Sequence, residues 1–257
     1  MEKISLGDRI KCYEKSFQTY IKKNENIVIR LDGDSFSKFT KGFRKPFDKI
    51  LVETMNRTTK DLFEKFNCCF AYTQSDEITL VIKKSNEIIL GGKVQKLVSL
   101  SSGFCSTKFN KNLRQVLKEE RKNLNENLFK KLSKKVGEAW FDSRVFGLED
   151  EVEVFNTVLW RMRDAERNSI SMLGYANFSH KTLLNMNSEE KKKFFLENGL
   201  DWDELDDGLK YGYYFKRKIF KREIDNVKRR KVDCFAKKFY FLEENVKLIF
   251  EKEVEVE

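Results

Sequence analysis

Two acidic segments of this chain follow short apolar runs, and both carry residue types that metal-dependent chemistry uses. Ile27–Leu31 ends at Asp32-Gly33-Asp34, and Cys69–Tyr72 runs into Gln74-Ser75-Asp76-Glu77. If the two runs are neighbouring strands, their carboxylates converge, and charges about 4 Å apart repel by roughly 4 kcal/mol at an effective dielectric near 20. Such a pair needs a cation, and oxygen ligands with open positions suit Mg²⁺ held together with substrate phosphates. The pattern therefore indicates phosphoryl transfer with two metal ions, although each segment alone is also an ordinary turn signal.

The elements that must position these acids follow from hydrophobic spacing and turn signals. The ranges expected, in chain order, are a helix over Leu6–Lys22, a strand over Asn26–Leu31, a helix over Phe47–Phe66, a hairpin of Cys69–Tyr72 with Ile78–Ile82, a helix over Gly92–Leu117 and a strand over Trp140–Phe146. This order is βαββαβ, so we expect an α+β fold with a palm-like (ferredoxin-like) antiparallel sheet and helices packed on it. In that arrangement the first strand and the hairpin are neighbours, as the convergence of Asp32 and Asp76 requires.

The C-terminal third predicts a mixed helical and β elaboration of this sheet. Glu151–Met172 has the spacing of a helix, Asn187–Leu209 is acidic and helical, and Tyr211–Phe220 is typical of a strand. Asp233–Phe250 fits either a strand or a helix. We expect residues 1–136 to form a palm-type catalytic core and residues 137–257 to complete the sheet and contribute RNA-binding elements, with one compact domain as the alternative.

The formal charge of +10 indicates a polyanionic partner, and the position of the charge sharpens this prediction. Residues 83–135 hold fourteen Lys or Arg and four Glu. Within them, five basic residues recur at helical spacing and so share one face: Lys108, Lys111, Arg114, Lys118 and Lys122. A second basic block spans Lys216–Lys231. Each block alone is equally typical of a solvated surface, but the two together with a candidate metal site predict nucleic-acid binding, with Lys108, Lys111 and Arg114 among the contacts.

Other features exclude several classes of function. The chain has a single histidine, so histidine-dependent triads and multi-histidine metal sites cannot be built within it. Its five cysteines contain no C-x-x-C pair, which indicates reduced thiols rather than a disulfide framework or a zinc site. No apolar stretch is long enough for a membrane span and no apolar signal region follows Met1, so we expect a cytoplasmic protein with no membrane partner.

Four ordered motifs resemble those of the tRNA-histidine guanylyltransferase superfamily, the 3′→5′ nucleotide-adding polymerases. They are Arg30-Leu31-Asp32-Gly33, Phe36-Ser37-Lys38-Phe39, Lys45-Pro46-Phe47-Asp48 and Gln74-Ser75-Asp76-Glu77. Phe141-Asp142-Ser143-Arg144 and Asn156-Thr157-Val158-Leu159-Trp160 match later landmarks, and the resemblance extends from about Asp8 to Leu184.

The chain departs from the eukaryotic members of this superfamily at two places. Those enzymes have H-I-N-N just before the last landmark, where this chain has Asp150-Glu151-Val152-Glu153, and they tend to carry histidine where this chain has Ser37. The chain is therefore more similar to the bacterial and archaeal guanylyltransferase-like proteins. That resemblance implies a template-dependent enzyme that repairs tRNA 5′ ends.

The same resemblance implies the reaction and its partners. Two Mg²⁺ ions assist, and ATP and GTP serve as substrates. ATP adenylylates the 5′-monophosphate of the tRNA, and the 3′-hydroxyl of the next nucleotide then displaces AMP. The resemblance also implies a homotetramer, a dimer of dimers.

Carried over by motif, the resemblance implies roles for individual residues. Asp32, Asp76 and Glu77 are the expected catalytic acids, with Asp32, the Gly33 carbonyl and Asp76 as metal ligands. The expected nucleotide-binding residues are Gly33, Asp34, Ser35, Phe36, Lys45, Asp48 and Ser75. The expected phosphate or tRNA contacts are Lys93, Lys96, Arg144, Asn156 and Lys181.

Two other functions fit parts of the pattern. A nucleotide cyclase also uses a palm-like sheet and an acidic hairpin, but its small substrate needs no basic stripe. A non-catalytic RNA-binding module would explain the basic stripe and leave the acids as turn residues. Alanine at Asp32 and Asp76 separates the module from the enzymes, because the module keeps its RNA affinity and has no activity to lose.

Overall fold

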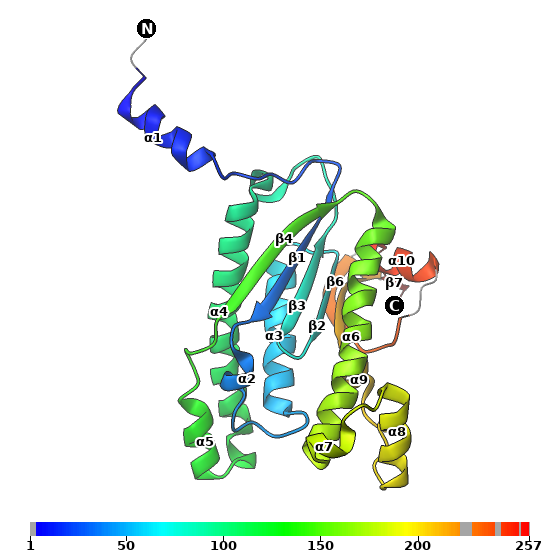
Figure 1. Ribbon diagram of the computed structural model, residues 1–257. Helices are drawn as coiled ribbons and strands as arrows, with labels where there is room; N and C mark the ends of the chain where they lie inside the picture. Colours follow the sequence, from blue (N-terminus) through cyan, green and yellow to red (C-terminus); the bar gives the residue numbers. More distant parts are fainter. Residues whose placement is uncertain (1–3, 222–227, 240–242, 252, 257) are drawn as a thin grey trace.

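A single sheet forms the centre of the molecule (Figure 1). The computed structural model describes residues 4–221, 228–239, 243–251 and 253–256. The strands are β1 (Asn26–Gly33), β2 (Phe70–Gln74), β3 (Glu77–Ile82), β4 (Phe141–Leu148), β5 (Tyr213–Lys221), β6 (Lys228–Phe235) and β7 (Glu253–Val256). They are arranged in the order β4-β1-β3-β2-β5-β6 with antiparallel neighbours, and β7 pairs in parallel with β5.

Helices cover both faces of this sheet. α3 (Lys49–Lys65) and α4 (Val94–Glu119) lie on one face, and α6 (Glu151–Asn177) lies on the other (Figure 1). Side chains alternate between the two faces along each strand, as strand geometry requires. Ile29 of β1 packs with the core under α3 and α4, whereas its neighbour Val28 packs with the core under α6. The sheet therefore separates two apolar cores.

The shorter elements extend these layers. They are α1 (Leu6–Lys15), α2 (Phe36–Phe39), α5 (Glu126–Ser133), α7 (His180–Leu183), α8 (Ser188–Glu197), α9 (Asp207–Tyr211), α10 (Glu243–Phe250) and two 3₁₀ turns, Ile89–Gly92 and Glu120–Asn123. A third, smaller core gathers where α6, α7 and α8 meet, around Leu173, Leu183 and Phe195. Among the described residues, no helix combines the length and the apolar character that crossing a bilayer requires.

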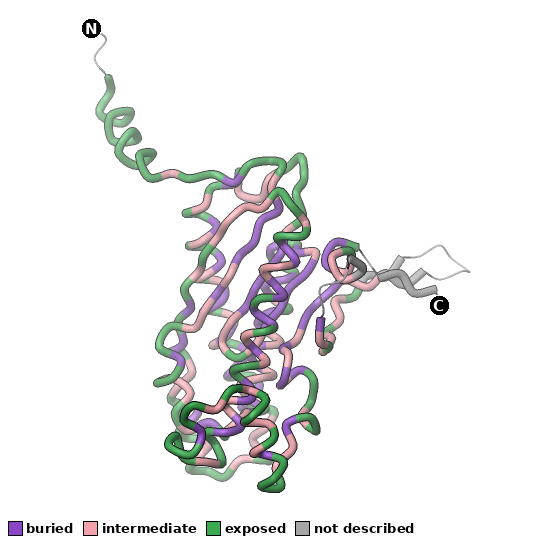
Figure 2. The backbone as a smooth tube through the Cα atoms, turned by 45° about the vertical axis from the view of Figure 1, so that its right-hand side comes forward, coloured by how far each residue is buried: buried purple, intermediate pink, exposed green. Residues whose placement is uncertain are grey.

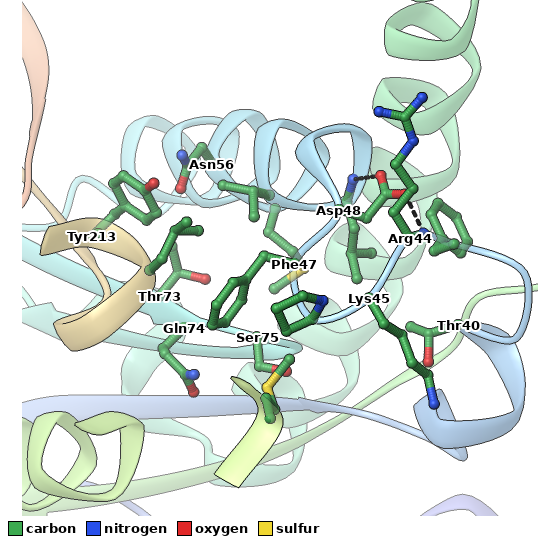
Figure 3. A pocket seen from close by; sticks show the side chains of 18 residues that line it. Thr40, Arg44, Lys45, Phe47, Asp48, Asn56, Thr73, Gln74, Ser75 and Tyr213 are labelled. Atoms are coloured by element: carbon green, nitrogen blue, oxygen red, sulfur yellow. Dashed lines mark hydrogen bonds between the residues drawn. The ribbon is translucent and has the colours of Figure 1, made fainter. Parts of the chain in front are cut away.

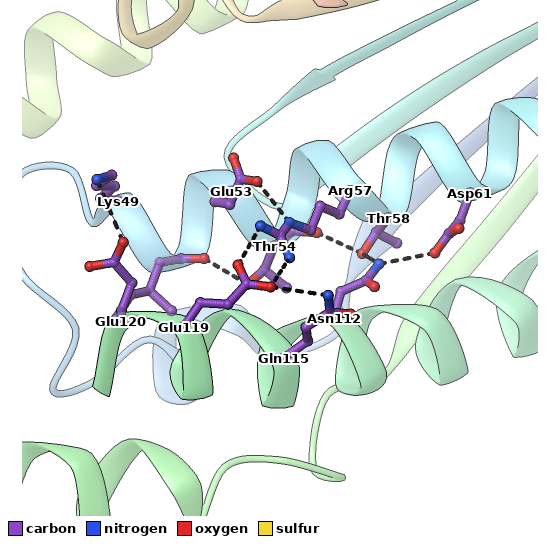
Figure 4. A network of polar contacts seen from close by, with 11 residues as sticks. Lys49, Glu53, Thr54, Arg57, Thr58, Asp61, Asn112, Gln115, Glu119 and Glu120 are labelled. Carbon is purple, nitrogen blue, oxygen red and sulfur yellow. Dashed lines mark hydrogen bonds and ion pairs between the residues drawn. The ribbon is translucent and has the colours of Figure 1, made fainter. Parts of the chain in front are cut away.

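Charged side chains fasten α3 to α4 (Figure 4). The Arg57 guanidinium donates to both Glu119 oxygens at 2.9 and 2.6 Å, and its Nε donates to Glu53 at 2.7 Å. The hydrogen bond from Arg57 is the main cause of a lowered Glu119 pKa. Asn112 Nδ2 donates to Asp61 at 3.1 Å further along the same contact. Because Arg57 and Glu119 are partly exposed, this network orients the helices more than it stabilises them.

The predicted α+β fold and its βαββαβ order are confirmed. β1, α3, the β2–β3 hairpin, α4 and β4 follow one another as expected, and β1 lies directly beside the hairpin. β4 and β5 pair with β1 and β2, so both parts of the chain contribute strands to one sheet. A division between a catalytic core and a C-terminal part at residue 136 stays a prediction.

The N-terminal helix is shorter than predicted. α1 ends at Lys15, not at Lys22. The chain leaves the helix because its next residues bind elsewhere: Tyr20 forms a β-bridge with Lys93, and the Ile21 amide donates to the Gly92 carbonyl at 2.9 Å. α1 itself projects from the body of the molecule and is exposed along its length (Figures 1 and 2).

Two C-terminal segments, each of which was predicted as one element, contain parts of two elements in the structure. Asn187–Leu209 contains α8 and only the start of α9, because Gly199 has a φ of +74° after α8 and Asp206 caps the start of α9. Asp233–Phe250 contains both the end of β6 and α10, with residues 240–242 outside the described part of the chain.

Candidate active site

Asp32 and Asp76 lie at the same end of the sheet. Leu31 of β1 pairs with Ile78 of β3, so Asp32 lies beside the β2–β3 turn that carries Asp76. Burial, and then the negative charge of Asp32, raise the pKa of the Asp76 carboxyl to about 6. Among the described residues, neither acid forms an ion pair with a basic side chain. The two carboxylates therefore form a pair without a counter-charge, as their sequence positions predicted.

This donor set fits Mg²⁺ bound together with a nucleotide. In the described part of the chain, no three His, Cys, Asp or Glu side chains are arranged to hold a metal by themselves. Mg²⁺ does not need such a cage, because one or two carboxylates plus substrate phosphates and water complete its shell. Asp32, Asp76 and the carbonyl of Gly33 supply hard oxygen donors at this position.

β4 extends the polar surface beside β1. Asp142 pairs with Asp32 and Arg144 pairs with Arg30 across the two strands, so all four residues face the same side of the sheet. The Arg144 guanidinium lies 3.8 Å from an Asp142 oxygen and is 57% exposed. Arg144, a predicted phosphate contact, is therefore near the paired acids with an open cationic group.

Glu77 is held by α6. Arg161 Nε donates to Oε2 of Glu77 at 2.7 Å, and Arg161 Nη2 donates to Oε1 at 2.6 Å. Arg30 Nη2 lies 3.6 Å from the same Oε1. Arg161 was not predicted as a site residue, although the sequence contains one signal for it. It follows Val158 by three residues on the apolar face of the predicted helix, where a charged residue needs a partner.

The residues after Asp32 form a tight loop. A Cβ at Gly33 would lie 2.2 Å from the Phe36 ring, and Ser35 has a φ of +53°. The Asp34 amide donates to the Trp140 carbonyl at 2.9 Å. Phe36 is buried in the core under α3 and α4, so what it can offer a nucleotide is its backbone. Asp34 and Ser35 are exposed next to the acids.

A cavity of about 160 Å³ opens beside the hairpin (Figure 3). Lys45, Asp48 and Ser75 line it, so the structure brings together three of the predicted nucleotide-binding residues. Lys45 lies at one side of the cavity, and Asn56 and Tyr213 lie at the other (Figure 3).

Asp48 shapes this cavity through the backbone. Its carboxylate accepts from the amides of Arg44 at 2.7 Å, Ile50 at 2.8 Å and Leu51 at 3.3 Å. Asp48 is thus the N-cap of α3 and fixes the loop that carries Lys45.

The predicted phosphate and tRNA contacts are spread over the molecule. Lys93 and Lys96 are exposed at the start of α4, and Lys93 forms a β-bridge with Tyr20. The start of α4 lies at the opposite end of β1 from the end that leads into α2 (Figure 1). Asn156 donates to Glu153 on its own helix at 2.9 Å. Lys181 is exposed on α7.

The stripe on α4 is less uniform than its spacing predicted. Lys108 lies 3.3 Å from Asp61 and 5.3 Å from the centre of the Phe104 ring, so its charge is already partnered. Lys111 and Arg114 are exposed. In the second basic block, residues 222–227 lie outside the described residues.

Carboxylates at neighbouring strand ends of a palm-like sheet are the arrangement through which many nucleotidyltransferases bind metal, and this chain is an enzyme of that class. It belongs to the tRNAHis guanylyltransferase family, whose family model matches residues 7–149, more than half of the 257 residues. This membership confirms the resemblance carried by the sequence motifs. Of the alternatives considered, it supports an enzyme over a non-catalytic RNA-binding module.

Individual relatives agree with this membership. The chain is 28% identical to an uncharacterized protein of Acanthamoeba polyphaga mimivirus over 98% of this chain and 91% of the relative. It is 35% identical to a probable tRNA(His) guanylyltransferase of Drosophila melanogaster over 37% of this chain and 35% of the relative. A solved bacterial tRNA(His) guanylyltransferase (Thg1)-like protein in complex with ATP superposes with a TM-score of 0.70 and 31% identity, covering 89% of this chain and 91% of that chain.

Proposed function

We propose that this enzyme adds nucleotides in the 3′→5′ direction to the 5′ end of tRNA, directed by the opposing acceptor strand. The observation that carries this proposal is the uncompensated pair Asp32 and Asp76 beside a cavity that holds Lys45 and Ser75. Acids without a counter-charge at a strand end need a cation, and a lysine at the adjoining cavity needs an anion. A nucleoside triphosphate with Mg²⁺ satisfies both.

The metal ligands in this proposal are Asp32, the Gly33 carbonyl and Asp76. These residues would hold two Mg²⁺ ions, which when bound would lower the pKa of the attacking hydroxyl and neutralise charge on the departing group. The chain's own residues do the positioning: the short β2–β3 turn presents Asp76, and the pairing of β1 with β3 sets Asp32 beside it. Positioning and electrostatics supply most of the catalysis in phosphoryl transfer, so no histidine is needed.

The nucleotide in this proposal occupies the cavity. Solved relatives hold ATP in one case and GTP in another. Lys45 is exposed on the loop that Asp48 fixes, so it can bind phosphate oxygens. Leu51 and Met55 give the cavity an apolar wall, which suits a base.

The tRNA in this proposal lies across exposed basic residues. Arg144 is next to the acids, and Lys111 and Arg114 are exposed on α4.

Assembly as a homotetramer is also proposed. Leu6 and Tyr13 on the projecting α1 are 67% and 70% exposed, and a lone helix of ten residues is marginal in water, so α1 needs a partner surface.

A 5′-end assay tests the proposed function. The substrate is a tRNA that lacks its first nucleotide and carries a 5′-monophosphate, supplied with ATP, Mg²⁺ and each labelled nucleotide in turn. The expected result is addition of the nucleotide that pairs with the opposing base, abolished by Asp76→Asn and retained by Asp61→Asn. No addition to any 5′ end, with RNA binding intact, would contradict the proposal.

A further inference from the structure

The turn that carries Asp76 is short and strained. Gln74 pairs with Glu77, so the turn contains only Ser75 and Asp76. Ser75 has a φ of +54°, in the left-handed region that residues other than glycine rarely adopt. Such a conformation persists only where the surrounding structure holds it in place. The position of Asp76 therefore depends on what fastens Glu77 and Gln74.

Glu77 is fastened at both its backbone and its side chain. Its carbonyl accepts from Thr73 Oγ1 at 2.8 Å. Its carboxylate accepts two hydrogen bonds from Arg161, at 2.6 and 2.7 Å, and the two side chains are 20% and 6% exposed. A bidentate guanidinium–carboxylate pair fixes direction as well as distance. α6 thus holds the strand end next to Asp76.

Arg161 is itself held in place. Its Nη2 also donates to Asp164 at 2.9 Å, and Asp164 accepts from Arg167 at 2.9 Å. Its guanidinium carbon lies 4.5 Å from the centre of the Trp160 ring. With each Glu77 oxygen accepting a hydrogen bond from Arg161, Glu77 is placed to hold the turn.

We infer that Arg161 is a positioning residue for the metal site: it acts through Glu77 to hold the turn at which Asp76 meets the cations. This inference rests on the proposed function, because it takes Asp76 to be a metal ligand. It also changes the expected role of Glu77 from catalytic acid to the link between Asp76 and α6. An ion pair that only joined α6 to the sheet would affect stability and leave the metal requirement unchanged.

The test measures the Mg²⁺ concentration for half-maximal nucleotide addition in four variants. Arg161→Met is expected to raise this concentration by about 10-fold, the lower end of the effect of losing a direct outer partner of a metal ligand, because Arg161 acts on Asp76 through Glu77. Arg161→Lys keeps the charge and loses the bidentate geometry, so it falls between wild type and Arg161→Met. Glu77→Gln keeps an acceptor for Arg161 and is expected to be far milder than Asp76→Asn. Arg167→Met, on the same helix and also bonded to Asp164, serves as the matched control and stays within about 2-fold of wild type.

Two results would overturn the inference. One is an Arg161→Met or Arg161→Lys enzyme with a lowered melting temperature and an unchanged Mg²⁺ requirement. The other is a Glu77→Gln enzyme as inactive as Asp76→Asn, which would make Glu77 a ligand or an acid in its own right. If Arg161→Met fails to fold because Glu77 keeps only the more distant Arg30, the inference is tested on two other variants. These are Arg161→Lys and the double variant Arg161→Met with Glu77→Gln, and an unchanged Mg²⁺ requirement in both overturns the inference.

A direct binding measurement separates this inference from the proposed function. Binding of Mn²⁺ is followed by the EPR signal of the free ion in mixtures of the protein with a non-hydrolysable ATP analogue, because substrate phosphates complete the shell of the metal. The Mn²⁺ bound by the analogue alone is measured separately and subtracted. A wild type that binds Mn²⁺ but adds no nucleotide contradicts the proposed function, and weaker Mn²⁺ binding by Arg161→Lys then still supports the inference. A wild type that binds no Mn²⁺ contradicts both.

Discussion

The two faces of the sheet use the same strands for different purposes. Toward α3 and α4, β1 and β3 present apolar side chains such as Leu31 and Leu80, which are fully buried. Toward α6, the ends of the same strands carry charged side chains: Arg30 and Asp32 on β1, and Glu77 on β3. Since side chains alternate along a strand, one short sequence supplies a core on one face and a reactive edge on the other.

The difference between the faces extends to stability. Arg30 and Thr79 are cross-strand partners on the α6 face. Among the described residues, Arg30 Nε and Thr79 Oγ1 are buried and have no hydrogen-bond partner. Each such group costs about 1–3 kcal/mol. The face under α3 and α4 therefore contributes to the free energy of unfolding without this cost. The α6 face contributes less than it could, because it holds unpaired polar groups near the site.

The largest effect we expect comes from the apolar face. Leu31→Ala should lower the free energy of unfolding by about 2–5 kcal/mol, because it leaves a cavity in a fully buried core. The rate per folded molecule should change little, since Leu31 points away from its neighbour Asp32. Urea unfolding measures the free energy of unfolding. The rate per folded molecule is the initial rate divided by the concentration of active enzyme from active-site titration. A loss of rate beyond the loss of folded protein would show that the two faces are not independent.

Asp76→Asn, on the polar face, is expected to have the opposite effect to Leu31→Ala: lost activity with little loss of stability. It should reduce nucleotide addition by at least about 100-fold, since a direct ligand matters no less than its outer partners. Without metal the variant should melt no lower than wild type, because burial and the charge of Asp32 disfavour the ionised carboxylate in the folded state. Single-turnover rates and thermal melts check both expectations.

Mg²⁺ provides the control for this variant. It should raise the melting temperature of wild type, because it binds the folded state, and should raise that of Asp76→Asn much less. Equal shifts in the two proteins would place the metal elsewhere.

A smaller effect is expected at the cavity. Lys45→Met should raise the KM for the activating nucleotide by about 10-fold or more, because the variant loses one charge-assisted hydrogen bond to the nucleotide. Lys41→Met, a neighbouring exposed lysine that does not line the cavity, is the matched control. Initial rates over a range of ATP concentrations measure the change, and equal KM values for the two variants would remove Lys45 from the nucleotide site.

The smallest effects concern the basic stripe. Lys111→Gln and Arg114→Gln should each lower the salt dependence of tRNA binding by about one ion, because each is free to neutralise a phosphate. Lys108→Gln should change it less, since Lys108 already pairs with Asp61. Binding measured at several salt concentrations separates them, and an effect of Lys108→Gln as large as that of Lys111→Gln would show that tRNA displaces Asp61.

Local patterns were enough for most of the sheet. The apolar run before Asp32 and the two apolar runs that flank Gln74–Glu77 predicted β1 and the β2–β3 hairpin within a few residues. The end of α1 was not predictable, because helical spacing continues through Phe17 and Tyr20 while a distant segment at Gly92 captures the backbone. Contacts between distant segments leave no mark on local spacing.

The sequence alone determined which residue types could do the chemistry, the order of the elements and the family to which the chain belongs. Only the tertiary structure decided which of these groups meet. It joined Glu77 to Arg161, 84 residues away, and committed Lys108 to Asp61 while leaving Lys111 open. The physical reason is that residue type and spacing set what a side chain can bind, whereas packing between helices and sheet sets which partner lies within the few ångströms where charge and hydrogen bonding act.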